Sequence, residues 1–124
     1  MYTMKFNEQQ AGIIQNALNF YFRSFLGQLD LWHVSIDGES FDYFERNIVE
    51  GALKNVMKLS QNSSYGINSK EIPDMARDAA DIRGVIRHQL WKDREGHSEH
   101  TVDASPPTRY GTLALPEIKR EDTP

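Results

Sequence analysis

Arginine and histidine side chains that could bind an anion lie together on one predicted helix. Arg83 and Arg87 are one helical turn apart, His88 follows directly, and both arginines fall next to the apolar positions of residues 73–95. Two neighbouring guanidinium groups can hold a phosphate or a carboxylate from another chain, because their planar N–H forks match the oxygen atoms of these anions. A solvated helix face explains the same residues, and the sequence leaves both interpretations open.

A second set of polar residues interrupts the most apolar predicted helix, at YFRSFLGQLDLW, residues 21–32. Gly27 lies one turn after Arg23 on the same side of a helix and leaves a gap where another residue would have a side chain. We therefore expect a notch beside Arg23, with Gln28 able to bond the backbone of its occupant. The loop around Tyr65 and Gly66, or the tail, is the expected occupant. The alternative occupant is an anionic nucleotide, and Tyr65 would then stack on its base.

No arrangement typical of catalysis or of a metal centre stands out. The HSEH stretch at 97–100 lacks the helical His-x-x-x-His spacing of zinc motifs and an obvious third ligand, so we expect a solvated loop. The serines at 60, 63 and 64 have no spacing that ties them to His88, and nucleophile-elbow, phosphate-loop and dinucleotide motifs are missing. The sequence therefore predicts a protein that is not an enzyme and has no metal or cofactor, with a small hydrolase as the weaker alternative.

Composition restricts the class of protein further. A length of 124 residues, with 39% hydrophobic and 26% charged residues, is typical of one globular domain. A net charge of −4 gives no domain-wide basic field, so nucleic-acid binding is disfavoured. Cysteine does not occur, which fits a reducing cytoplasm, and the sequence shows neither a signal peptide nor a long apolar run. We expect no membrane association.

Helical periodicity predicts three helices, at about 7–33, 40–59 and 73–95, in one helical domain over residues 1–96. Asn7 and Gln10 match a capping box at the start of the first helix, and Pro73 suits the first turn of the third. Residues 97–124 contain four of the five prolines and little periodicity. The predicted fold is therefore mainly α, a three-helix domain with an irregular, partly extended Pro-rich tail whose end is mobile.

Charged and aromatic residues lead to two more expectations. Asp74, Arg77, Asp78 and Asp81 are expected on a solvated outer face of the third helix. Residues 20–22 are three consecutive aromatics, which span about 200° of helix surface and cannot all face one core. Some apolar surface should therefore remain exposed, and a homo-oligomer is the simplest way to cover it.

Four stretches, taken in order, resemble a group of small hypothetical proteins of tailed bacteriophages. They are Tyr21-x-Arg23-x-x-x-Gly27-Gln28, Ser64-Tyr65-Gly66-Ile67, Asp81-Ile82-x-x-Val85-Ile86-Arg87-His88 and Leu115-Pro116-x-Ile118. The resemblance covers most of residues 11–118, and the chain departs from it at residues 91–93.

The resemblance implies an accessory phage protein made in the host bacterial cytoplasm. Our leading hypothesis is a non-enzymatic protein that binds and inhibits a host protein, a bacterial defence component. The alternative is an oligomeric small-ligand binder that sequesters an anionic nucleotide signal through Arg23, Arg83 or Arg87.

Overall fold

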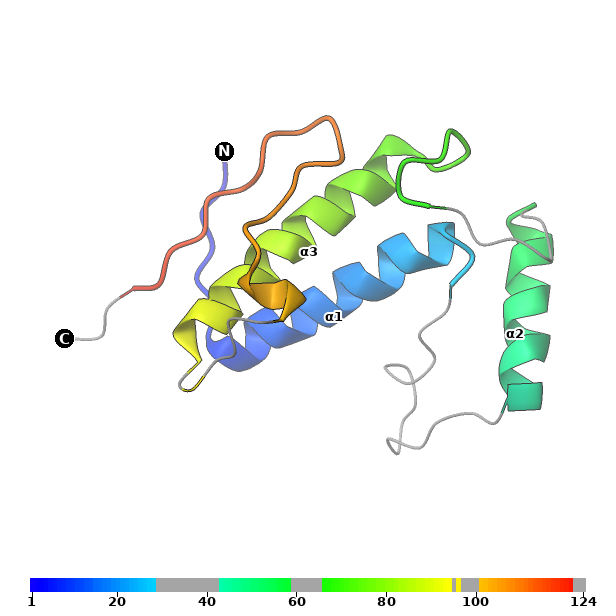
Figure 1. Cartoon of the computed structure of the whole chain (residues 1–124), viewed down its shortest axis with the longest axis horizontal. Helices are drawn as coiled ribbons and strands as arrows, with labels where there is room; N and C mark the ends of the chain where they lie inside the picture. The colour runs from blue at the N-terminus through cyan, green and yellow to red at the C-terminus, as the bar shows by residue number, and fades with distance from the viewer. Residues whose placement is uncertain (29–42, 59–65, 95, 97–100, 122–124) are drawn as a thin grey trace.

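Helices account for all the regular structure of the described residues. The computed structural model describes residues 1–28, 43–58, 66–94, 96 and 101–121. The elements are α1 (Glu8–Phe25), α2 (Tyr43–Val56), α3 (Asp74–Asp93) and a short 3-10 helix, η2 (Val102–Ala104) (Figure 1). No strand occurs among these residues. The prediction of a mainly α, three-helix fold is therefore confirmed.

A capping box begins α1, as predicted. The Asn7 side chain accepts a hydrogen bond from the Gln10 backbone N–H at 2.8 Å, and the Asn7 N–H donates to the Gln10 side chain at 2.9 Å. Two of the amides that a helix start leaves without an intrahelical partner are thereby bonded.

The first helix ends at Phe25, so the prediction that it continues to about residue 33 is wrong. Gly27 has a φ of 75°, a conformation that costs residues with a Cβ atom about 1–2 kcal/mol. Its N–H donates to Ser24 O at 3.1 Å, and the Gln28 N–H donates to Arg23 O at 2.9 Å. These two bonds form a Schellman motif, which closes the helix by satisfying its last carbonyls. The glycine is thus explained by the helix end.

Helix α3 keeps close to its predicted bounds, but Arg77 does not lie on a solvated outer face. Its Nε donates to Ile67 O at 2.8 Å and its Nη1 to Ile72 O at 2.9 Å, while Nη2 bonds Ser69 O. Arg77 therefore fixes the loop that leads into α3, because one guanidinium satisfies three loop carbonyls.

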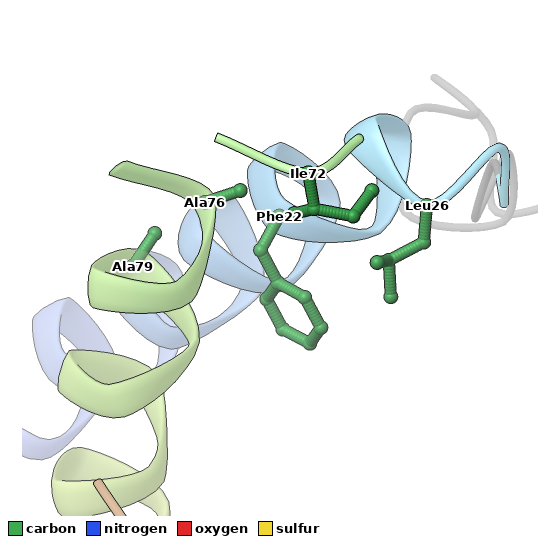
Figure 2. Packing of buried hydrophobic residues seen from close by; sticks show 5 residues of the cluster. All are labelled: Phe22, Leu26, Ile72, Ala76 and Ala79. Atoms are coloured by element: carbon green, nitrogen blue, oxygen red, sulfur yellow. The ribbon is translucent and has the colours of Figure 1, made fainter. Parts of the chain in front are cut away.

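The buried core lies between α1 and α3. Phe22 and Leu26 come from the end of α1 and its cap, Ile72 comes from the loop before α3, and Ala76 and Ala79 are on α3 (Figure 2). The two alanines have small side chains, which leave room for the larger groups of α1. None of the buried residues in the described part of the chain belongs to α2, which lies apart from the α1–α3 pair (Figure 1).

The tail returns along α3 and is held by two aspartates. Asp81 is 3% exposed, and its two carboxylate oxygens accept the N–H groups of Tyr110 and Gly111, each at 2.8 Å. Asp78 Oδ1 accepts the next two amides, from Thr112 at 2.9 Å and from residue 113 at 3.2 Å. The expectation that these carboxylates face solvent is therefore wrong, because they bond four consecutive tail amides.

Gly111→Ala tests this attachment of the tail. A Cβ at Gly111 would overlap the Asp78 carboxylate, so we expect a loss of about 1–3 kcal/mol in unfolding free energy as the amide bonds are displaced. Trypsin should cleave faster at the exposed Arg109. Chemical denaturation and timed proteolysis measure both effects.

Gly84→Ala is the matched control, because nothing lies within 4 Å of the added Cβ. It should stabilise α3 by up to about 1 kcal/mol, since alanine is the better helix former. An alanine at Gly111 that is equally tolerated would contradict the described docking.

Candidate functional site

Two arginines lie over the buried ring of Phe22, and the charge of a third acts on one of them. The guanidinium carbon of Arg23 lies 5.5 Å from the ring centroid and that of Arg83 lies 5.9 Å from it. Arg87 follows one turn after Arg83 on α3, and its charge acts on Arg83. We call Arg23, Arg83 and Arg87 the arginine cluster. The structure thus brings together the three arginines that the sequence nominated from two separate helices.

Within this cluster, Arg23 is bonded to its own helix end. Its Nε donates to Asn19 Oδ1 and its Nη1 to Gln28 Oε1, both at 2.9 Å. Asn19 is only 7% exposed, so Arg23 satisfies a polar group that would otherwise be buried without this donor. Arg23 and Gln28 therefore stabilise the end of α1. The helical geometry from which a notch beside Arg23 was expected does not occur, because α1 ends at Phe25 and Gly27 lies beyond its cap. The expected occupant, Tyr65, lies outside the described residues.

Arg87 and His88 connect α3 to η2. Arg87 Nε lies 3.1 Å from Asp103 Oδ1, an ion pair in which the N–H does not point at the oxygen. His88 Nδ1 lies 2.8 Å from Asp103 O. A carbonyl can only accept, so His88 Nδ1 is the donor. The His88 ring also stacks on Trp91 at 5.4 Å between centroids. His88 is thereby held in one orientation.

Arg83 differs from the other two arginines because no hydrogen bond joins its buried Nε, and no ion pair joins its guanidinium, to a described residue, whereas Arg23 bonds two amide oxygens and Arg87 pairs with Asp103. Burial lowers the pKa of Arg83 to about 10, with smaller contributions in the same direction from the charges of Arg87 and Arg23, and Asp103 opposes the shift. Arg83 is still protonated at neutral pH.

The direction of this pKa shift makes protonated Arg83 unfavourable for folding. Its pKa in the folded protein is about 10, below the ordinary value of an arginine, so the unfolded chain binds the proton more tightly. The charge therefore opposes folding at all pH values below about 10, and the penalty disappears only as pH rises above that value. A bound anion would relieve the same penalty at neutral pH.

Sequence reasoning missed two members of this site, Phe22 and Asp103. The sequence pattern places Phe22 only in the group of aromatics, and Asp103 lies in the tail without any informative spacing. Both become visible only once α1 and η2 are placed on α3.

The described residues offer neither a metal site nor a membrane-spanning helix as an alternative to the arginine cluster. The histidines of HSEH lie outside the described residues, and within the described ones no group of three or more His, Asp or Glu is placed to hold a metal ion. None of the helices in that part of the chain is both long and apolar enough to cross a membrane.

Comparison of the chain with protein-family models, with curated proteins and with solved structures finds no match. Proposals about function therefore depend on the chemistry of the site.

Arg23→Ala tests the structural role of this arginine. Removing the guanidinium leaves the buried Asn19 carbonyl without its donor, so we expect a loss of about 1–3 kcal/mol in unfolding free energy, measured by chemical denaturation. Arg109→Ala, at an exposed tail position, should change the stability by less than about 0.5 kcal/mol. Equal stability of the two variants would show that the bonds to Asn19 and Gln28 contribute nothing.

Proposed function

We propose that the protein is a non-enzymatic binding protein whose arginine cluster receives a phosphate-bearing ligand. The observation that carries this proposal is the buried Nε of Arg83, which has no partner among the described residues. A buried donor without an acceptor is costly, and a ligand oxygen would remove that cost.

The charge of the site favours a dianion. Arg23, Arg83 and Arg87 contribute three positive charges, and Asp103 is the one carboxylate, among the described residues, that acts on Arg83. The amide partners of Arg23 carry no charge. The site therefore has an excess of two positive charges, which a phosphate group neutralises and a single carboxylate does not. Arginine also suits phosphate because it offers several N–H groups in a fixed plane.

Binding without conversion of the ligand is supported by the composition of the site. The groups at the cluster are guanidiniums, a phenyl ring, the Asp103 carboxylate paired with Arg87, and a histidine whose Nδ1 already donates to a backbone carbonyl. These groups hold and orient an anion. The ring of Phe22 keeps one side of the guanidiniums dry, which strengthens their attraction for an anion.

The resemblance to phage proteins supports a wider proposal about biological context. A phage accessory protein made in the host bacterial cytoplasm could act by sequestering an anionic nucleotide signal at this site. The other form of the proposal is that the chain binds and inhibits a host defence protein. In that form, the arginine cluster binds no phosphate-bearing ligand. The two forms differ in whether free phosphate-bearing compounds bind.

Thermal unfolding in inorganic phosphate tests the site. A phosphate concentration tenfold above the dissociation constant stabilises the folded chain by roughly 1.4 kcal/mol, a rise of a few degrees in Tm for a domain of this size. Chloride at the same ionic strength should give a smaller rise, because it cannot accept several guanidinium N–H groups at once.

Arg83→Met sharpens this test. Methionine keeps an apolar stem against Phe22 without a desolvated charge, so the variant should be more stable than the parent in chloride, by on the order of 1 kcal/mol after allowing for solvent screening. It should also lose the additional response to phosphate.

Arg109→Met is the control, since it removes one positive charge at an exposed tail position. It should keep both the parental Tm and the phosphate response. If Arg83→Met responds to phosphate as the parent does, the arginine cluster is not the anion site.

A further inference from the structure

A carboxylate lies beside the positive charges of the arginine cluster. Asp103 Oδ1 is 3.1 Å from Arg87 Nε, and the charge of Asp103 also acts on Arg83. The side chains of Arg87 and Asp103 are 28% and 35% exposed, so water screens this ion pair only in part. Because a carboxylate repels an anion, Asp103 weakens the attraction of the cluster for phosphate. Anion binding by itself therefore does not account for Asp103.

The backbone around Asp103 is held in place by two hydrogen bonds. His88 Nδ1 donates to Asp103 O at 2.8 Å, and the Ala104 N–H donates to Thr101 O at 3.1 Å, which closes η2. The first bond joins η2 to α3, and the second fixes the turn that carries the carboxylate. Asp103 is therefore positioned at Arg87 by a defined element of the fold.

Arg83 and Arg87 are placed so that one diphosphate group could bridge them. They lie one turn apart on the same side of α3, about 6 Å along the helix axis. Arg83 has a buried Nε without an acceptor among the described residues, whereas Arg87 is paired with Asp103. A second phosphate would have to lie at Arg87, where it would meet the carboxylate. A single phosphate at Arg83 avoids most of this repulsion.

We propose that Asp103 determines ligand specificity, because it occupies at Arg87 the place that a second phosphate would need. The cluster then accepts a phosphate monoester, such as a sugar phosphate or a nucleoside monophosphate, and discriminates against diphosphates and triphosphates. His88 is the positioning residue, since its bond to Asp103 O holds the carboxylate at Arg87. This inference rests on the proposed function and narrows its class of ligand.

Calorimetric titration with inorganic phosphate and with pyrophosphate tests this specificity, at constant ionic strength and at a slightly alkaline pH where phosphate is mainly a dianion. The unmodified protein should bind phosphate at least as tightly as pyrophosphate, although pyrophosphate carries more charge. Asp103→Asn keeps the shape of the side chain without its charge. It should tighten pyrophosphate binding by about tenfold or more and phosphate binding by less.

Glu117→Gln is the control for a general effect of net charge. It removes one negative charge at an exposed tail position, so it should keep the parental ratio of the two dissociation constants.

Two variants of His88 test its positioning role. His88→Asn keeps an N–H donor near the place of Nδ1, whereas His88→Phe keeps a ring for Trp91 without the donor. His88→Phe should shift the ratio of dissociation constants several-fold toward pyrophosphate, and His88→Asn should retain the parental ratio. A His88 that serves only stability would leave the ratio unchanged in both variants.

Two results would overturn the inference and leave the anion site intact. One is tighter binding of pyrophosphate than of phosphate by the unmodified protein, a measurement that does not depend on the folding of any variant. The other is the parental ratio in Asp103→Asn. Absence of binding of both anions would instead contradict the proposed function, and the inference would fail with it.

Discussion

The buried carboxylate of Asp81 is the constraint on which the arrangement of this chain depends. A carboxylate at 3% exposure is strongly unfavourable unless donors surround it. Its donors are the amides of Tyr110 and Gly111, 29 and 30 residues further along the chain. The tail must therefore turn back onto α3 to supply them (Figure 1). The segment between helix and donors includes η2, and it is this segment that brings Asp103 to the arginines.

Helix α3 consequently uses several of its polar side chains to fix other parts of the chain. Arg77 bonds the preceding loop, Asp78 and Asp81 bond the tail, and His88 bonds η2. These side chains satisfy backbone groups in place of the strands or further helices that a larger domain would use. Arg83 stands out against this pattern, since its buried Nε bonds none of the described groups and, unlike Arg87, it pairs with no described carboxylate. The proposed anion site depends on this difference between Arg83 and the other polar residues of α3.

The sequence predicted features whose causes are local. The capping box at Asn7 was predictable because both partners lie within one turn, whereas the bonds of Asp81 join positions far apart and leave no periodic signal. The sequence pattern places Gly27 inside the first helix, because the apolar period continues past it and does not encode a positive φ. Arg83 was nominated from its place beside the apolar face. Its contact with Phe22 depends on how α1 packs on α3, which the sequence does not specify.

The central claim is that Arg83 binds an anion through its buried Nε–H group. NMR of the arginine Nε–Hε groups during titration with inorganic phosphate tests this claim. The account predicts a saturable shift and slower hydrogen exchange for the Arg83 signal, with no change at the exposed Arg109. An Arg83 signal that does not move, or a uniform drift of all arginine signals with added salt, would contradict the claim.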